Sequence, residues 1–316
     1  MKIFIEIPTW LGDAVMATPA IENIIALYPD AKLTILGSFV SSKIFLHHPN
    51  VEKIIIDDSR KEGFRYKNLY KIAKSVENVD IALSFRRNFT SDFLLFFIDA
   101  KKKYRYKRYT QEEIHLVKRY NDFINNSFKI DTKPNQLKIY GYEKQTNKKP
   151  LLGVNPGATY GSAKRWYPEK FAEVITLFSK EYDTIIFGGP SEVDMANDIE
   201  SILLYNGISN YTNLAGKTSV EELLANINNL DLFITNDSGP MHVASAFNIP
   251  SICIFGPTKF IETSQWKNEK SIIVKKEFDC MPCMKRECPL KDEEYHQCMK
   301  SIMPQDICKA YKDLNL

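Results

Sequence analysis

Hydrophobic residues recur along the chain in short runs that alternate with stretches of helical periodicity. Buried strands are predicted at residues 2–8, 32–37, 52–57, 79–85, 151–157, 183–189, 230–237 and 250–257. Helices are predicted between them, at residues 12–29, 64–77, 168–181, 192–205, 219–228 and 239–247. Short apolar strands separated by helices are typical of parallel sheets with crossover connections. The pattern therefore predicts an α/β fold.

A polar segment separates the elements of the first half from those of the second. Residues 131–150 contain two prolines and no sustained hydrophobic period, which is typical of an interdomain linker. The length of 316 residues also exceeds what one hydrophobic core usually supports. We therefore predict two doubly wound, Rossmann-like domains, residues 1–150 and 151–316. A ligand site is expected in a cleft between them, lined by the carboxyl ends of the strands.

Charge is distributed unevenly between these halves. Residues 1–150 hold 26 Lys and Arg against 17 Asp and Glu, whereas the remainder holds 16 against 22. The densest basic stretch is KKKYRYKRY at 101–109, which includes Lys101, Lys102, Lys103 and Arg105. These side chains are candidates for binding phosphorylated sugars, nucleic acid or lipid headgroups. The structural alternative is a basic edge strand protected from aggregation.

The sequence predicts neither a membrane span nor a secretory signal. No apolar run approaches the roughly 20 residues that a membrane-spanning helix needs. Glu6 and Pro8 interrupt the N-terminal apolar stretch, so it lacks the core of a signal peptide. We therefore expect a cytoplasmic protein.

All six cysteines lie after residue 250, and five of them cluster near the C-terminus. Those five are Cys280, Cys283, Cys288, Cys298 and Cys308. A cytoplasmic location argues against a disulfide framework. The CxxC pair suits one edge of a tetrahedral zinc site, with His296 as a spare ligand, but the other spacings match no standard finger. We expect packed, reduced thiols and no metal cofactor, with a structural zinc ion as the alternative.

Candidate chemistry begins in the loop after the first strand. Gly12 and Asp13 open the following helix, and the GxGxxG of a dinucleotide-binding Rossmann fold is absent there. This absence argues against an NAD-dependent enzyme or a nucleotide-sugar epimerase. Asp13 has two interpretations, a helix cap favoured by the macrodipole or a general base.

Two loops of the second half have the composition of a phosphate or nucleotide site. The segment NPGATYGSAKRWYPEKF at 155–171 combines Thr159 and Lys164 with glycines that allow close backbone approach. Glu192 follows a glycine turn, where a carboxylate can accept hydrogen bonds from ribose. The structural alternatives are a turn with a solvated Lys-Arg pair and a glutamate at a helix start.

The segment after the strand at 230–237 is the most informative. Asp237, Ser238 and Gly239 open a helix whose first amides form a cradle for an anion, and His242 lies one turn inside. Read alone, these residues also suit a capped helix start. Because the ends of parallel strands meet at one edge of a sheet, we expect them near Lys164 and Glu192.

Three segments, in order along the chain, carry a family resemblance. They are IPTWLGDAVMATPAI at 7–21, NPGATYGSAKRWYPEKFAEV at 155–174 and NDSGPMHVASAFNIPSICIFGPT at 236–258. Together with the cysteine-rich tail, they resemble the lipopolysaccharide heptosyltransferases of glycosyltransferase family 9, with the tail and AKRWYP more similar to the type II than to the type I enzymes. The resemblance is weakest at 40–145. Where the family has RWP, this chain has one additional residue, Tyr167.

The resemblance implies a GT-B fold and an inverting transfer without a metal. L-glycero-D-manno-heptose would pass from ADP-heptose to the inner core, onto heptosyl-Kdo-lipid A for a type II enzyme or onto Kdo for a type I enzyme. We also expect a monomer that binds no nucleic acid and is associated peripherally with the inner membrane. The basic half would face the anionic acceptor and the membrane surface.

Site residues follow from the same resemblance by their place in the motifs. Asp13 would be the general base, and Lys164 a catalytic residue that stabilises the departing ADP. The donor would be bound by Thr159, Lys164, Glu192, Asp237, Ser238, Gly239 and His242. We also assign acceptor contacts to Gly12 within the first motif and, outside the motifs, to Lys101, Lys102, Lys103 and Arg105.

Overall fold

The computed structural model describes residues 1–61 and 63–315 and divides into two compact units, Met1–Gly141 and Tyr142–Leu316. Residues 131–150 contain neither helix nor strand. The boundary falls earlier than the predicted residue 150 because the chain after Gly141 is fixed to the second unit. Lys144 Nζ lies 2.9 Å from Asp231 Oδ1, and the Tyr142 ring packs 5.7 Å from that of Phe247.

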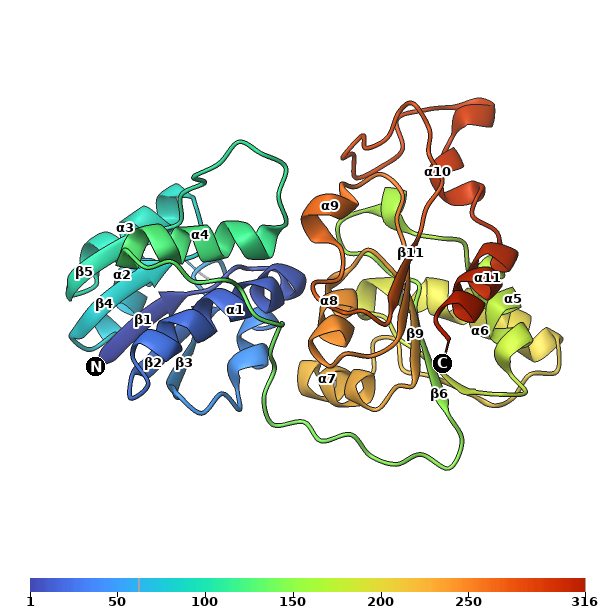
Figure 1. Ribbon diagram of the computed structural model, residues 1–316, viewed down its shortest axis with the longest axis horizontal. Coiled ribbons are helices and arrows are strands. Elements are labelled where there is room, and N and C mark those ends of the chain that lie inside the picture. The colour runs from blue at the N-terminus through green and yellow to red at the C-terminus, as the bar shows by residue number, and fades with distance from the viewer. Residues whose placement is uncertain (62, 316) are drawn as a thin grey trace. The chain divides into compact units, whose positions relative to one another are not determined.

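The first unit is built on a five-stranded parallel sheet (Figure 1). Its strands are β1 (Lys2–Glu6), β2 (Lys32–Gly37), β3 (Val51–Ile56), β4 (Val79–Ser84) and β5 (Ala100–Arg105). Its helices are α1 (Leu11–Leu27), α2 (Arg65–Ser75), α3 (Phe89–Phe97), α4 (Leu116–Phe128) and the short 3-10 helix η1 (Ser41–Phe45). The order β3-β2-β1-β4-β5 reverses direction between β1 and β4. Helix α1 packs against α4, and α2 packs against α3.

The second unit repeats this winding on a six-stranded parallel sheet with the order β11-β10-β9-β6-β7-β8. Its strands are β6 (Leu151–Asn155), β7 (Asp183–Ile186), β8 (Tyr211–Asn213), β9 (Leu232–Asn236), β10 (Ser251–Ile254) and β11 (Ser271–Val274). Its longer helices are α5 (Pro168–Phe178), α6 (Val193–Tyr205), α7 (Val220–Asn228), α8 (Gly239–Ala246) and α11 (Pro304–Asp313). Short helices lie at η2 (Ser162–Lys164), η3 (Pro190–Glu192), α9 (Phe260–Thr263), η4 (Asp292–Glu294) and α10 (Gln297–Lys300). The order reverses between β6 and β9, and ligands of open α/β sheets bind at such switch points.

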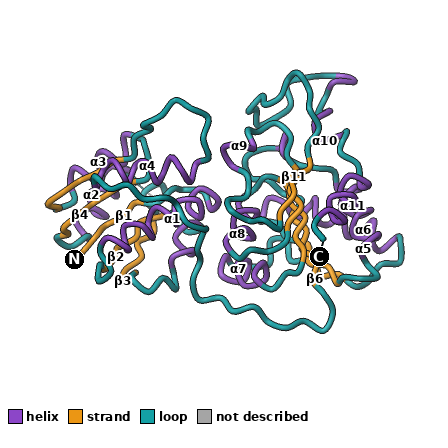
Figure 2. The backbone as a smooth tube through the Cα atoms, viewed as in Figure 1, coloured by secondary structure: helices purple, strands orange, loops and turns teal. Residues whose placement is uncertain are grey.

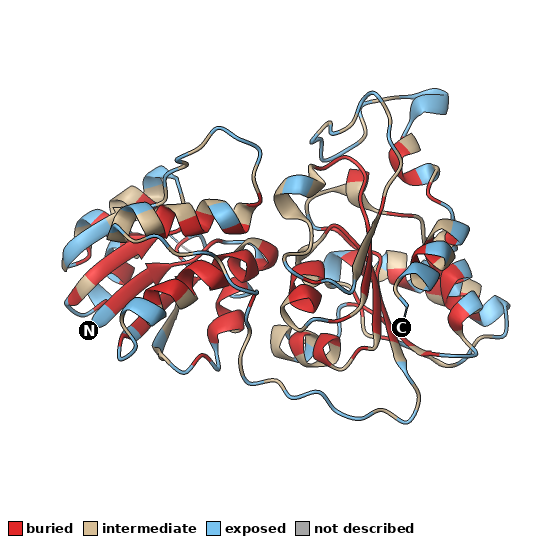
Figure 3. Ribbon diagram, in the orientation of Figure 1, coloured by how far each residue is buried: buried red, intermediate tan, exposed pale blue. Residues whose placement is uncertain are grey.

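The structure confirms the predicted α/β class, with two doubly wound parallel sheets. Helix α4, strand β11 and helix α11 were not predicted. The basic stretch at 101–105 forms the edge strand β5, which is the structural alternative raised for it. Figure 3 shows this strand largely exposed, whereas its neighbour β4 and the central strand β1 are buried. Helix α5 begins with Pro168 as its first residue, so the additional Tyr167 stands at the cap position.

Local sequence explains where several helices begin. The Asn88 side chain accepts a hydrogen bond from the amide of Ser91 and caps α3. Ser219 and Glu222 form a capping box at the start of α7. Both helices follow the carboxyl end of a strand, β4 for α3 and β8 for α7, and the tube view shows the loops that join helices and strands in each unit (Figure 2). Such loops carry the candidate chemistry.

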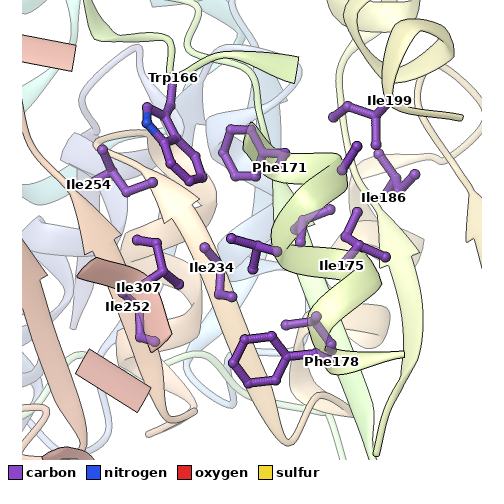
Figure 4. Packing of buried hydrophobic residues seen from close by; sticks show 14 of the residues in the cluster. Trp166, Phe171, Ile175, Phe178, Ile186, Ile199, Ile234, Ile252, Ile254 and Ile307 are labelled. Atoms are coloured by element: carbon purple, nitrogen blue, oxygen red, sulfur yellow. The ribbon is translucent and has the colours of Figure 1, made fainter. Parts of the chain in front are cut away.

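The core of the second unit holds a large buried cluster, part of which is shown in Figure 4. Trp166 and Phe171 pack edge to face, 4.9 Å between ring centroids, and they face Ile254 and Ile234 of the sheet. Burying an aromatic side chain of this size contributes about 3 kcal/mol. Trp166 therefore anchors one end of the loop that contains Lys164. Among the helices within 1–61 and 63–315, none combines the length and apolarity that crossing a bilayer requires.

Candidate functional site

A buried ion pair at the switch point of the second sheet joins Lys164 to Asp237. Lys164 ends η2 in the loop after β6, and Asp237 directly follows β9. The Lys164 Nζ lies 2.5 Å from Asp237 Oδ2, and the two side chains are only 12% and 4% exposed. Thr258 Oγ1 donates to the same carboxylate oxygen at 2.6 Å. The carboxylate thus fixes the position of the lysine ammonium group at this sheet edge.

Hydroxyl and amide groups surround this ion pair. Asn155, the last residue of β6, donates from Nδ2 to Ser238 Oγ at 3.2 Å. The hydroxyl of Ser238 also lies 3.3 Å from that of Thr235. Ser238 is the N-cap residue of α8, and its side chain makes no capping hydrogen bond. The first amides of α8 therefore begin beside Lys164, which combines a helix N-terminus with a fixed cation, as an anion site requires.

Glu192 lies against the loop after β6. It is 7% exposed, and its Oε2 accepts a hydrogen bond from the Gly189 amide at 2.8 Å. A Cβ atom on Gly157 would lie only 2.0 Å from Glu192 Cδ. Asp194 is exposed in the first turn of α6. Glu192 is therefore the carboxylate at this edge, and it sits there because Gly157 has no side chain.

Gly157 offers a matched test of this arrangement. We expect Gly157→Ala to displace the Glu192 carboxylate, to lower stability by about 1–3 kcal/mol and to weaken binding of a nucleotide donor. Gly189→Ala is the control, because its Cβ would lie 3.7 Å from Glu192 Oε2, an ordinary contact. Thermal unfolding and the donor KM measure both effects. Equal behaviour of the two variants would contradict the role given to Gly157.

The cysteine-rich tail holds the Lys164 loop from outside. The Tyr160 hydroxyl donates to the Met284 carbonyl at 2.7 Å, and the Ala163 amide donates to the Arg286 carbonyl at 3.0 Å. The Trp166 indole donates to the Ile302 carbonyl at 3.0 Å. The Lys164 ammonium also lies 4.8 Å from the centre of the Tyr160 ring. These contacts give the loop a single geometry.

His296 also holds this loop in place, and both of its ring nitrogens are engaged in hydrogen bonds instead of pointing to a metal site. Its Nε2 donates to the Ala163 carbonyl at 2.9 Å, and its Nδ1 accepts from the Tyr167 hydroxyl at 2.9 Å. Burial lowers the pKa of His296, so the ring stays neutral near pH 7 and both nitrogens are occupied. Burial likewise raises the pKa of Tyr167 to about 12. The hydroxyl therefore remains a donor.

The tail cysteines are free thiols, and four of the five line one small pocket. It is lined by Cys280, Cys283, Cys288 and Cys298, together with His296. Burial, followed by the neighbouring thiols, raises the pKa of Cys298 to about 11. Across residues 1–61 and 63–315, no group of three or more His, Cys, Asp or Glu side chains is placed to hold a metal ion.

The remaining donor-site candidates take different positions. Gly239 is the first residue of α8, directly after Ser238. His242 is buried within the same helix, with 4% exposure. Thr159 is exposed in the loop before η2. The structure thus brings Lys164 together with Asp237 and Ser238, while no contact joins Thr159 to them.

In the first unit, Asp13 lies in the first turn of α1, after β1. Trp10 occupies the cap position and makes no side-chain cap hydrogen bond, so Asp13 is not the N-cap residue. It is the acidic residue of the first turn, where the helix macrodipole favours a negative charge, as the structural interpretation also predicted. Gly12 is buried beside it. Burial raises the pKa of Tyr120, and the negative charge of Asp13 raises it further. Asp13, at the carboxyl edge of the first sheet, thus lies close enough for its charge to act on Tyr120 of α4, which packs against α1.

Three arginines lie close enough for their charges to act on Tyr106, which follows β5 at this edge. The sequence interpretation missed Arg87 and Arg119, whereas Arg108 belongs to the basic stretch 101–109 that it singled out. Burial raises the pKa of Tyr106, whereas the charges of Arg119, Arg108 and Arg87 oppose that shift. The Tyr106 ring in turn lies 5.4 Å from that of Tyr120. The helical spacing of apolar residues around Arg119 is the one sequence feature that could have placed this residue on a helix. Arg87 and Arg108 sit in loops whose course no pattern predicts.

A buried ion-pair network fixes the loop that carries Arg87. Arg86 Nη1 lies 3.2 Å from Glu6 Oε1 and 3.2 Å from Asp57 Oδ2. The Ser84 hydroxyl donates to Glu6 at 2.5 Å. Burial raises the pKa of Glu6, and the Arg86 charge opposes that shift. The network ties together the carboxyl ends of β1, β3 and β4.

The predicted acceptor lysines lie elsewhere on the first sheet. In register, Lys102 pairs with Ile81 in mid-strand, and Arg105 reaches Ser84 at the carboxyl end of β4. Lys101 binds Asp80 at 2.6 Å, Lys103 donates to the Phe96 carbonyl at 3.1 Å, and Arg105 pairs with Asp92. Only Arg105 reaches the edge where Gly12 and Asp13 lie. The structure does not bring the three lysines to it.

Comparison with known proteins places the chain among characterised relatives. The family model for glycosyltransferase family 9 (heptosyltransferase) matches residues 69–293. Lipooligosaccharide heptosyltransferase 2 of Campylobacter jejuni is 42% identical over 321 residues, covering 99% of this chain and 98% of the relative.

Solved structures resemble the fold along nearly the whole chain. The Escherichia coli ADP-heptose LPS heptosyltransferase II has a TM-score of 0.81 at 22% identity, covering 99% of this chain and 98% of that chain. The Escherichia coli heptosyltransferase WaaC, solved with ADP, has a TM-score of 0.79 at 15% identity, covering 99% and 100%. These likenesses confirm the predicted GT-B fold class. With the match to the family model and the full-length relative, they show that the chain belongs to glycosyltransferase family 9, the heptosyltransferases.

Proposed function

We propose that this glycosyltransferase transfers L-glycero-D-manno-heptose from ADP-heptose to a heptose of the lipopolysaccharide or lipooligosaccharide inner core, as a heptosyltransferase of the second type. The observation that carries the proposal is the buried Lys164–Asp237 pair beside the N-terminus of α8, at the switch point of the second sheet. Full-length similarity to a lipooligosaccharide heptosyltransferase 2 supports the substrate class. The enzyme acts at the cytoplasmic face of the inner membrane, where its acceptor is anchored.

The donor diphosphate binds between Lys164 and the first amides of α8. Asp237 itself is a poor partner for a diphosphate because like charges repel. Its role is to position the lysine, with Thr258 as a further support. Glu192 accepts hydrogen bonds from the ribose, and Ser238 and His242 contact the donor heptose and phosphates. Negative charge grows on ADP as it departs, so Lys164 stabilises the transition state more than the ground state.

The chemical step is a single displacement at the anomeric carbon. The acceptor hydroxyl oxygen forms the new glycosidic bond while the bond from that carbon to the diphosphate oxygen breaks. The electron pair of that bond leaves with ADP, and Asp13 takes the hydroxyl proton. Attack on the face opposite the leaving group inverts the configuration. The sugar carries oxocarbenium character in between, as it does in glycoside hydrolysis.

The acceptor is held by the first unit, next to Asp13. Arg87, Arg108 and Arg119 provide the positive charge that an anionic inner core requires, since guanidinium groups bind phosphates and carboxylates in a bidentate manner. Arg108 is fixed by the loop itself, donating from Nε to the Thr110 carbonyl at 2.7 Å. These arginines replace Lys101, Lys102 and Lys103 as the proposed acceptor contacts.

The test is transfer from ADP-heptose to two defined acceptors, heptosyl-Kdo-lipid A and Kdo-lipid A. We expect one heptose to be added to the first acceptor, with mass spectrometry giving the mass and NMR giving the linkage and anomeric configuration. Transfer to the Kdo acceptor alone would assign the enzyme to the first type. Absence of transfer to either acceptor would overturn the proposal.

A further inference from the structure

Helices α2 and α3 of the first unit expose a continuous group of aromatic side chains. Phe64 and Phe89 are each 69% exposed, and Phe96 is 75% exposed. Three such phenylalanines in one area are unusual, because the surfaces of soluble proteins seldom gather large apolar side chains. We refer to the rings of this group as the aromatic surface, which comprises Phe64, Tyr66, Tyr70, Phe89, Phe93, Phe96 and Phe97.

The rings of the aromatic surface touch one another in a chain. Tyr66 lies 5.6 Å from Phe64, 6.1 Å from Phe89 and 5.1 Å from Phe93, between ring centroids. Phe97 lies 4.8 Å from Phe93 and 5.0 Å from Phe96. Tyr70 joins the chain at 5.0 Å from Phe97. The exposed phenylalanines are therefore held in place by the half-buried rings between them.

Positive charge borders the aromatic surface. Helix α2 has the sequence RYKNLYKIAKS, with Arg65, Lys67, Lys71 and Lys74 and no acidic residue. Lys74 Nζ lies 5.7 Å from the centre of the Tyr70 ring. On the other side, Lys103 of β5 donates to the Phe96 carbonyl. Asp92 is the acidic residue of α3, and it is paired with Arg105.

We propose that the aromatic surface, with the basic residues of α2, docks the enzyme on the anionic phospholipid bilayer. Exposed aromatic rings enter the boundary between headgroups and acyl chains, and lysines beside them are attracted to anionic lipid headgroups. A second copy of the chain fits this surface less well, because pairing two such faces brings basic helices together. The charge of α2 thus selects the lipid surface as the partner.

The position of the aromatic surface matches a lipid-anchored acceptor. Phe89 begins α3 two residues after Arg87, which follows the carboxyl end of β4. Arg65 Nη2 donates to Thr90 Oγ1 at 3.3 Å, which joins the starts of α2 and α3. The surface therefore reaches the sheet edge that carries Asp13. Only this match to a lipid-anchored acceptor rests on the proposed function. The choice of an anionic bilayer rests on the exposed aromatic rings and the basic side chains of α2.

Co-sedimentation with vesicles, in the absence of donor and acceptor, tests the docking. We expect the full chain to bind vesicles of phosphatidylglycerol and phosphatidylethanolamine, and binding to fall with added salt. The variant Phe64→Ser, Phe89→Ser, Phe96→Ser should bind roughly 100-fold more weakly. The variant Leu204→Ser, Tyr205→Ser is the matched control, because these residues are 62% and 92% exposed in the second unit. It should bind as the unmodified chain does.

A second measurement locates the contact directly. Phe96→Trp keeps an aromatic ring at the surface, and its fluorescence should be quenched by vesicles containing brominated lipids, beyond the quenching of the unmodified chain. Tyr205→Trp should show no added quenching. Equal vesicle binding by the triple serine variant, or no binding by the unmodified chain, would overturn the proposal. Concentration-dependent self-association lost in the triple variant would instead make this face an interface between copies.

Transfer to a deacylated, water-soluble acceptor separates this proposal from the proposed function. The triple variant should retain full transfer to that acceptor and lose transfer only to acceptor embedded in vesicles. If vesicle binding fails while soluble transfer persists, the docking surface alone is refuted. If no acceptor receives heptose while vesicle binding persists, the proposed function alone is refuted.

Discussion

Asp13→Asn is expected to lower kcat for heptose transfer by about 10²- to 10⁴-fold, the usual contribution of a general base. The amide occupies nearly the same volume, so the first turn of α1 is retained. The amide, unlike the carboxylate that it replaces, cannot accept the proton of the acceptor hydroxyl. Binding of ADP-heptose, measured by calorimetry, should be unchanged, because Asp13 and the Lys164 loop belong to different units.

Asp30→Asn is the control for this experiment. Asp30 is an exposed carboxylate in the turn after α1, so the two variants change the charge of the same unit equally. Loss of the interaction between Asp13 and the helix macrodipole should cost only about 0.3–1 kcal/mol of stability. Transfer by Asp13→Asn within about tenfold of the unmodified enzyme would remove the assignment of this residue as the base.

Lys164→Met is expected to lower kcat/KM by about 10²- to 10³-fold, because the departing diphosphate loses its cationic partner. The expected effect includes kcat, since the charge on ADP is greatest in the transition state. Stability should fall as well. Asp237 is 4% exposed, and removing one partner of a buried pair leaves an uncompensated charge. Steady-state kinetics and thermal unfolding measure the two losses separately.

The double variant Lys164→Met, Asp237→Asn separates these two effects. Neutralising Asp237 removes the unpaired charge, so the melting temperature should recover while transfer remains low. Lys180→Ala, an exposed lysine after α5, should change neither property. Recovery of transfer in the double variant would show that Lys164 acts through stability and has no direct role at the diphosphate.

The sequence predicted the sheets better than it predicted the site. Short apolar runs such as 32–37 and 250–257 form strands because both faces of a parallel sheet are buried, and the pattern alone reveals this. Helix α4 was missed, although Val117, Tyr120 and Ile124 have helical spacing. Its polar residues and the irregular loop before it concealed that period.

Pairings between distant residues explain the rest of the difference. Lys164 and Asp237 were expected at one edge, yet their direct ion pair spans 73 residues of chain and depends on how two loops end. Lys101 to Lys103 were chosen for charge density alone. Strand register then placed them along β5, whereas Arg105 at the end of that strand, together with arginines from two loops and from α4, lies near the edge that carries Asp13. Composition shows which charged residues the chain contains, whereas their positions in space follow only from the fold.

The hydrogen bonds between the tail and the Lys164 loop determine when this loop can become ordered during synthesis of the chain. The Lys164 loop is held by carbonyls of Met284, Arg286 and Ile302, which are made more than a hundred residues later. Strands β6 and β9 can pair on the ribosome before those residues emerge. The donor loop then stays unsupported until the tail closes over it. A nascent chain arrested before residue 284 should therefore have a folded first unit but no affinity for ADP, so that the enzyme becomes competent only in the last steps of its synthesis.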